Sequence, residues 1–218
     1  MKLLIAIVFT AFLTGCAAPI HKHEIADLQK SKSILVTDTR PKQESEQKLF
    51  SALITSDAYG LYRFSTQSLD PSAERIFQHK LLEKFPDVGQ APNVTVFHFV
   101  TYWNTQSSFR KSALGAGLGG IIGAAIVGAN QNYDADFKTT TVNATQFNAI
   151  RDDDEYTKAF YTPEENPNKA PVFIVYIDAE INGKRSFIKG IAPSTRTDGK
   201  HSYLYAVENT IQAFLNGY

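Results

Sequence analysis

A single cysteine, Cys16, limits how this chain can be stabilised. The chain has 218 residues and no second cysteine, so no disulfide can form within it. A hydrophobic core must therefore supply the stability, and 43% apolar with 20% charged residues permits one. The length fits one domain of ordinary size. The 22 basic and 22 acidic residues balance, which argues against a nucleic-acid partner, because such proteins carry a basic face.

The first fifteen residues have the pattern of an export signal. Lys2 precedes the uncharged apolar run Leu3–Leu13, and small residues lead from this run to Cys16. A run of about eleven residues is too short to span a bilayer, which needs roughly twenty, but it suits a signal peptide. We therefore assign residues 1–15 to a signal peptide.

The sequence Leu13-Thr14-Gly15-Cys16 closely resembles the lipobox of bacterial lipoproteins. The resemblance implies cleavage before Cys16, a diacylglyceryl group on its thiol and a further acyl chain, such as palmitate, on the new amino terminus. Two or more chains give stable membrane attachment, at about 0.8 kcal/mol per buried methylene. An ordinary secretory signal with a chance cysteine is the alternative, and it leaves an unpaired thiol unexplained.

Two alanines, and no aspartate, follow Cys16. By resemblance to enterobacterial lipoproteins, this implies sorting to the outer membrane, facing the periplasm. Residues 16–32 are polar and of mixed charge, so we expect a lipidated tether. His21, His23 and Glu24 are residue types that ligate metals, but a flexible tether holds a metal poorly. The sequence therefore favours a solvated linker there.

The pattern of apolar residues over 33–218 predicts a single α+β domain. Strands are expected at 33–38, 61–64, 93–103, 137–147, 172–181 and 186–192, and helices at about 71–85 and 202–216. Asp70 is expected to cap the first helix, with Pro71 as its first residue. Asn182-Gly183 predicts a hairpin. Helices packed on one face of a mixed or mostly antiparallel sheet would bury both apolar stripes.

The strand expected at 93–103 has bulky residues on both sides, which indicates a central or doubly covered strand. Regular alternation places His98 on one face with four other residues, namely Val94, Val96, Val100 and Tyr102. His98 is a candidate site residue. A packed or hydrogen-bonded core histidine is the favoured interpretation.

A glycine-rich apolar insert, residues 112–130, separates two of the predicted strands. Glycine costs a helix roughly 1 kcal/mol against alanine in water, whereas small residues let helices approach closely in a membrane. The insert has glycines in rows spaced by four, and its candidate contact residues are Gly115, Gly119, Gly120, Gly123 and Gly128. The spacing favours a glycine-zipper helix about 25 Å long that enters the membrane or packs against copies of itself.

Other interpretations of the insert stay open. A flexible loop between strands and a buried helix of small residues both fit its composition. Gly115–Gly120 also matches Gly-x-Gly-x-x-Gly, but the run does not directly follow a strand as a nucleotide-binding loop would. We therefore expect no nucleotide site.

The sequence contains no strong catalytic or metal-binding pattern. Asp152–Glu155 form an acidic run, but it lacks the alternation and glycine of a calcium loop, so a solvated loop is favoured. No Gly-x-Ser-x-Gly elbow is present, and the single thiol is assigned to lipid. We therefore expect a protein that is not an enzyme and that holds no cofactor or metal.

The lipobox, the α/β body and the apolar insert together resemble oligomeric outer-membrane lipoproteins, such as the surface-exclusion lipoproteins of conjugative plasmids. This architectural resemblance transfers no functional residue, but it implies copies whose insert helices pack together in the membrane. We expect a cell-envelope lipoprotein with a structural or assembly role, with the membrane and further copies as partners. The alternative is a periplasmic accessory or binding module of a transporter or envelope complex, with the insert as a mobile loop.

Overall fold

The computed structural model describes most of the chain, namely residues 20–51, 53–86, 91–115, 136–196 and 201–218. Cys16 and the rest of the lipobox lie outside the described residues. So does most of the insert, with Gly119, Gly120, Gly123 and Gly128. Gly115 is the last residue of helix α3 (Gln106–Gly115), which begins just after a long strand ends.

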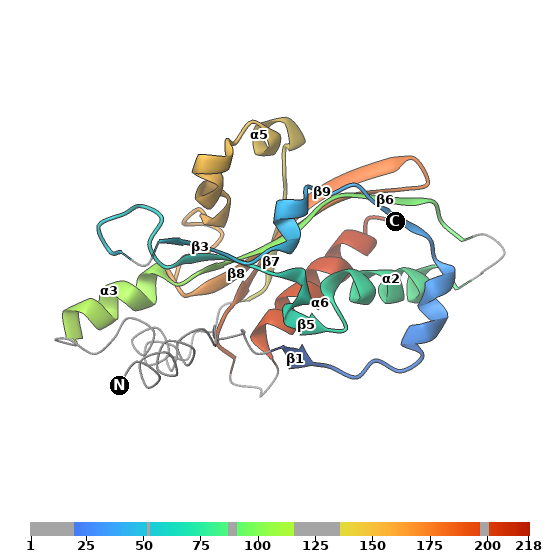
Figure 1. Ribbon diagram of the computed structural model, residues 1–218, viewed down its shortest axis with the longest axis horizontal. Coiled ribbons are helices and arrows are strands. Elements are labelled where there is room, and N and C mark those ends of the chain that lie inside the picture. Colours follow the sequence, from blue (N-terminus) through green and yellow to red (C-terminus); the bar gives the residue numbers. More distant parts are fainter. Residues whose placement is uncertain (1–19, 52, 87–90, 116–135, 197–200) are drawn as a thin grey trace, which may run out of the picture.

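A mostly antiparallel sheet forms the centre of the described structure (Figure 1), and this confirms the predicted α+β class. Its order is β3-β4-β6-β8-β9-β7, and β2 pairs in parallel with β6. The seven strands of this described sheet are β2 (Val36–Asp38), β3 (Lys48–Ser51), β4 (Leu61–Phe64), β6 (Val94–Asn104), β7 (Lys138–Thr141), β8 (Val172–Ile181) and β9 (Lys184–Pro193). The predicted hairpin joins β8 to β9, and Asn182 and Gly183 both have positive φ.

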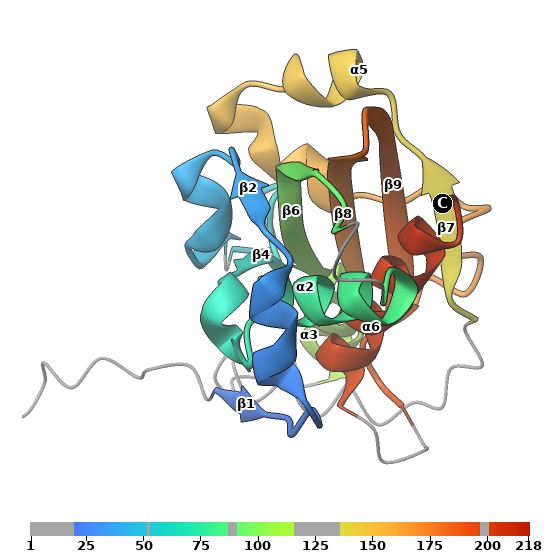
Figure 2. The same ribbon diagram turned by 90° about the vertical axis from the view of Figure 1, so that its right-hand side faces the viewer.

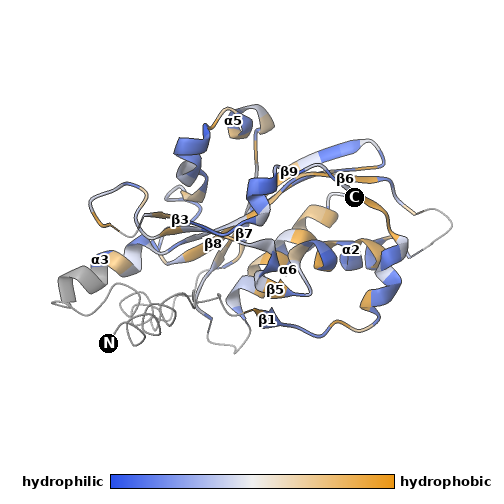
Figure 3. Ribbon diagram, in the orientation of Figure 1, coloured by the Kyte–Doolittle hydropathy of each residue, from blue (hydrophilic) through white to orange (hydrophobic). Residues whose placement is uncertain are grey.

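Two helices, α2 (Ala73–Lys84) and α6 (Ser202–Leu215), cover one face of the sheet (Figure 2), as the sequence predicts. Hydrophobic residues gather along α6 and β6 (Figure 3). The largest fully buried side chains of this core include Phe77, Phe99, Ile177, Ile211 and Phe214. We call this the helix face. Apolar burial of this extent supplies the stability that a chain without disulfides needs.

The opposite face is covered by less regular structure. Helix α5 (Ala144–Asn148) and the 3-10 helix η7 (Asp152–Ala159) lie over it, across the sheet from α2 and α6 (Figure 1). Phe147 and Ala159 pack there against the sheet. The sequence prediction of one strand over 137–147 is therefore wrong beyond Thr141. The side chain of Asn143 accepts a hydrogen bond from the Gln146 N–H and starts a helix instead.

Two further predictions are corrected at the amino-terminal side. Ser72, and not Asp70, caps α2, because its side chain accepts from the Arg75 N–H. Asp70 instead ends strand β5 (Leu69–Asp70), which pairs with β1 (His21–Lys22). The 3-10 helix η2 (Leu28–Ser33) then packs on α2. Residues 21–32, which the sequence assigns to the tether, therefore lie against the domain.

A β-bulge in β6 overturns the predicted alternation. Val96 pairs with Ala179 and His98 pairs with Asp178, so Phe97 is an extra residue. Val94 and Val96 consequently face α2 and α6, while three residues face the other side, namely His98, Val100 and Tyr102. One inserted residue exchanges the faces of everything beyond it.

Candidate functional site

The site begins at a gap in one edge of β6. Strand β2 pairs with β6 up to Val96, and β4 pairs with it from Thr101 onward. The 3-10 helix η3 (Lys42–Ser45) lies beside this gap. Glu44 Oε2 accepts a hydrogen bond from the Phe99 N–H at 3.1 Å. The carboxylate therefore satisfies a buried backbone group that no strand reaches there.

Glu44 also orients His98. Glu44 Oε1 lies 2.6 Å from His98 Nδ1, and a carboxylate only accepts, so Nδ1 donates. The imidazole packs on Phe187 and Phe147, with ring centroids 5.8 and 5.0 Å away. His98 is thus the packed, hydrogen-bonded core histidine that the sequence favours, but it also lines a cavity.

A second buried carboxylate, Glu155, enters from η7. Its Oε1 accepts from Arg63 Nη1 and, at 2.9 Å, from the Tyr102 hydroxyl. Its Oε2 accepts from Lys48 Nζ at 3.1 Å. Burial raises the pKa of the Glu155 carboxyl, but the hydrogen bonds from Arg63 and Lys48 outweigh it and the pKa lies below its usual value. Burial, with the nearby Glu155 charge, raises the pKa of Tyr102 well above its ordinary value.

These groups surround a cavity of about 300 Å³, here called the charged cavity. It is lined by residues from five stretches of the chain: Pro41, Gln43, Glu44, Lys48, Arg63, His98, Tyr102, Asn148, Ile150, Asp152, Glu155 and Lys158. The formal charges of this lining balance, with three carboxylates against three cations, apart from His98. Among these described lining residues there is no serine, threonine or cysteine to act as a nucleophile.

Lys158 differs from the other cations of the cavity. Its Nζ lies 4.0 Å from the centroid of the Phe147 ring, a cation–π contact. Within the described part of the chain, no carboxylate lies within ion-pair distance of it. Burial lowers the pKa of the Lys158 amine, and the charges of Glu44 and Glu155 offset this only in part.

A second cavity of about 320 Å³ adjoins the first, since Ile150 and Lys158 line both. Lys189 lines this second cavity and gives a comparison for Lys158. Its Nζ donates to Glu165 Oε2 at 2.8 Å and to the Phe160 carbonyl at 3.0 Å. Lys189 is therefore a paired cation on the same face of the sheet.

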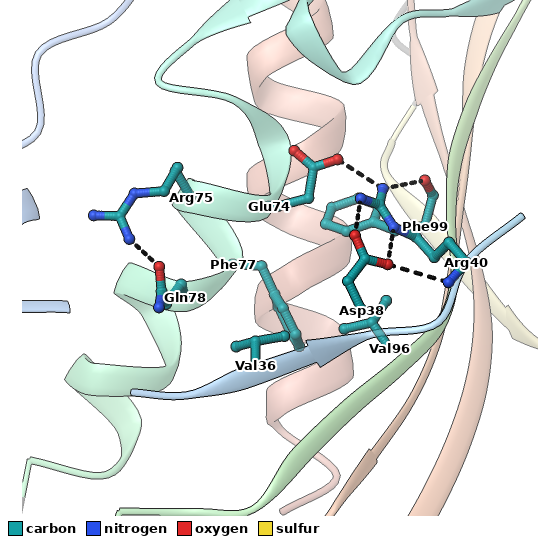
Figure 4. Close-up of a pocket in the computed structure, with 9 residues that line it drawn as sticks. All are labelled: Val36, Asp38, Arg40, Glu74, Arg75, Phe77, Gln78, Val96 and Phe99. Carbon is teal, nitrogen blue, oxygen red and sulfur yellow. Dashed lines mark hydrogen bonds and ion pairs between the residues drawn. The ribbon is translucent and has the colours of Figure 1, made fainter. Parts of the chain in front are cut away.

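A third pocket, of about 170 Å³, lies on the helix face between β2, α2 and β6 (Figure 4). Arg40 closes its polar side, with Nη1 2.6 Å from Glu74 Oε1 and Nη2 2.6 Å from Asp38 Oδ2. Its Nη1 also donates to the Phe99 carbonyl at 3.3 Å. Burial opposes the charge of Arg40, but Asp38 and Glu74 outweigh it and raise the pKa. The charges of this pocket are satisfied within the protein, so we assign them a structural role.

The candidate residues from the sequence are dispersed in the fold. His21 stacks on His201 with centroids 3.6 Å apart, and His23 Nε2 lies 3.8 Å from Glu208 Oε1. Among the residues the structure describes, no group of three potential ligands is placed to hold a metal. None of the helices described is both long and apolar enough to cross a membrane.

The acidic run is also corrected. Asp152–Asp154 are exposed, as expected of a solvated loop, but Glu155 is only 9% exposed and pairs with Arg63. Glu44, Arg63 and Lys158 belong to no motif that the sequence shows. The burial of Arg63 could have been predicted, because strand alternation places it on the same face as the buried Leu61.

Comparisons with protein-family models, with curated proteins and with solved structures found no match to this chain. Function is therefore inferred from the residues of the chain itself.

Proposed function

We propose that this chain is a lipid-anchored protein of the bacterial cell envelope, held at the outer membrane, with a structural or assembly role. The observation that carries the proposal is Leu13-Thr14-Gly15-Cys16 directly after a short apolar run. The remainder of the chain contains no other cysteine. A thiol that carries lipid explains why a single cysteine is present, whereas a structural disulfide would need two.

The position of α3 supports a contact role for the insert. Helix α3 follows β6 directly and extends beyond the end of the sheet (Figure 1). The described chain resumes before β7, at the far edge of the sheet from β3. The described chain therefore stops at Gly115, beyond the end of the sheet, and resumes before an edge strand, which suits an intervening segment that meets a membrane or another copy.

The anchor is tested by Cys16→Ser. We expect the natural protein to incorporate labelled palmitate and to sediment with membranes, and the variant to do neither. The domain is a matched internal control, because circular dichroism of both proteins should be the same. Unchanged processing and unchanged sedimentation of the variant would contradict the proposal.

The assembly role is tested by the size of detergent-extracted protein. We expect an oligomer that is lost when residues 112–130 are replaced by a flexible linker. Gly119→Leu with Gly123→Leu is a milder variant, since it keeps the apolar length but fills one glycine row. A monomer of unchanged size in all three proteins would overturn this role.

A binding module is the second candidate, and the charged cavity favours it. Buried charges are costly, and they gather around the charged cavity, whereas the core cluster of the helix face is formed by apolar side chains. Under this candidate the protein remains monomeric when the insert is removed, and it keeps its ligand.

A further inference from the structure

The described lining of the charged cavity includes one cation, Lys158, that forms no direct ion pair. Glu44 is bound by His98 and by the Phe99 N–H. Glu155 is bound by Arg63, Lys48 and Tyr102. Both buried carboxylates are therefore committed to partners that lie in the cavity wall.

Lys158 is left without a direct ion pair among the described residues. The third carboxylate of the lining, Asp152, is exposed and lies beyond ion-pair distance in the described structure, so its charge acts on Lys158 only at longer range. Among the described residues, the Lys158 amine has a cation–π contact with the Phe147 ring. A partly buried ammonium without a carboxylate partner is less favourable than an ion-paired one, and an anion entering the cavity would supply that partner.

We propose that the charged cavity binds a small molecule bearing one carboxylate, and that this carboxylate pairs with the Lys158 amine. The inference rests on the binding role given above as the second candidate. A volume of about 300 Å³ lies at the small end of ligand sites. The side-chain amides of Gln43 and Asn148 line the same space and supply neutral hydrogen-bonding groups for the rest of the ligand.

The charge of the lining favours a monoanion. Arg63 and Lys48 form ion pairs with Glu155, so Lys158 is the cation of the described lining that is available to pair with a ligand. A phosphate dianion would add a second negative charge close to the two buried glutamates, and like charges at short range repel strongly in a low dielectric. A single carboxylate matches the available ammonium.

Acetate and acetamide test this directly, because they have the same shape and differ in charge. The full-length, detergent-extracted protein is melted at pH 7.5 with either compound, at matched ionic strength. We expect saturating acetate to raise the melting temperature by about 2–4 °C. Acetamide and inorganic phosphate should leave it unchanged. Equal effects of acetate and acetamide would overturn the proposal.

Two lysine variants assign the effect to the cavity. Lys158→Met should abolish the acetate shift, and Lys158→Gln serves the same purpose if the methionine variant does not fold. Lys189→Met, or Lys80→Met on α2, should keep it. An acetate shift that survives in the folded Lys158 variant would refute the inference.

The outcomes also separate this inference from the wider proposals. A shift with phosphate that requires Lys158 would overturn the carboxylate class and leave the binding role standing. The palmitate and sedimentation assays on Cys16→Ser do not involve the cavity. Absence of the acetate shift would therefore refute the carboxylate site without bearing on the lipid anchor, which the Cys16→Ser assays test.

Discussion

The two faces of the sheet are shielded from water by different kinds of structure. On the helix face, α2 and α6 bury continuous apolar stripes, and the charged groups near it, such as Arg40, are fully paired. On the opposite face, short helices and irregular chain cover the sheet, and Glu44, Arg63 and Glu155 are buried beneath them. A face covered by regular helices can remain dry, whereas an irregular cover leaves polar groups to satisfy.

This difference in cover and in buried charge suggests that the helix face stabilises the fold and that the opposite face is suited to binding. Packing energy grows with apolar area removed from water, so the helix face should carry most of the stability. Buried ion pairs contribute little net stability, although breaking one is costly. Substitutions on the two faces should therefore change the unfolding free energy by different amounts and with a different dependence on pH.

The largest effect is expected from Phe77→Ala on the helix face. Phe77 is 1% exposed and packs against Phe99 and Phe214, with ring centroids 6.1 and 5.8 Å away. Loss of the ring should cost about 4 kcal/mol of unfolding free energy, because it removes apolar contact and leaves a cavity. Urea unfolding measures it. Leu35→Ala is the control: Leu35 is 81% exposed, so its loss should change the unfolding free energy little. A loss below about 1 kcal/mol for Phe77→Ala would contradict a dry, tightly packed helix face.

The next largest effect is expected from Glu155→Gln in the charged cavity, on the opposite face of the sheet. Arg63 would stay buried without its counter-charge, at a cost of about 3 kcal/mol. Because the pKa of Glu155 is lowered in the folded protein, its stabilisation is present above about pH 4.3, the ordinary glutamate value, and is lost as the pH falls through the folded pKa. The variant should therefore show a weaker loss of stability in acid.

Asp153→Asn is the matched control for Glu155→Gln. It lies in the same acidic run, but its ion pair with Arg151 is on the surface, and such pairs contribute at most about 1 kcal/mol. Denaturation at pH 7 and at pH 3 compares the two variants. Equal losses in both would mean that the acidic run is solvated throughout, as the sequence alone suggests.

Strands with uninterrupted local patterns are predictable from the sequence. β4 and β8 begin and end where the sequence analysis places them, because their apolar patterns are bounded by turn residues. The hairpin at Asn182-Gly183 follows from the positive φ that these residues tolerate. The strand predicted over 137–147 fails because the Asn143 side chain caps a helix within a stretch of strand-forming residues.

The charged cavity was not predictable in the same way. The Phe97 bulge decides which face His98 occupies, and it coincides with the gap between β2 and β4, a feature of the assembled sheet. Glu44, Arg63 and Glu155 come from separate elements that meet only after folding. Residue spacing along the chain does not indicate which of these side chains lie close together in the folded protein.

A smaller effect is expected from Gly190→Ala, which tests the close packing of α6 on β9. A methyl group there would overlap Thr210 Oγ1 and lie 2.9 Å from Thr210 Cγ2. Overpacking of this kind should cost about 2 kcal/mol. Adding Thr210→Ala removes both atoms and should restore part of the loss in a double-mutant cycle. Additive losses in thermal unfolding would show that α6 does not press on β9.

The smallest effect, and one of opposite sign, is expected from Lys158→Met. The folded protein holds a partly buried ammonium without a carboxylate partner, so its removal should raise the unfolding free energy by about 1 kcal/mol at pH 7. Because the pKa of Lys158 is lowered in the folded state, the natural protein should gain stability as the pH rises from the folded pKa towards about 10.4, and the variant should lack this gain.

Lys189→Met is the matched comparison for that variant. Burial lowers the pKa of Lys189 as well, but its amine is bound to Glu165. Removing it leaves the half-buried Glu165 carboxylate without its counter-ion and should destabilise the protein. Urea unfolding of both variants at pH 7 compares a cation kept without a partner with one that has a partner. A binding site retains groups that reduce stability, so a gain at Lys158 and a loss at Lys189 would mark Lys158 as kept for a ligand. Losses of equal size would show that Lys158 is held by the fold, and the two faces of the sheet would then differ only in how they are covered.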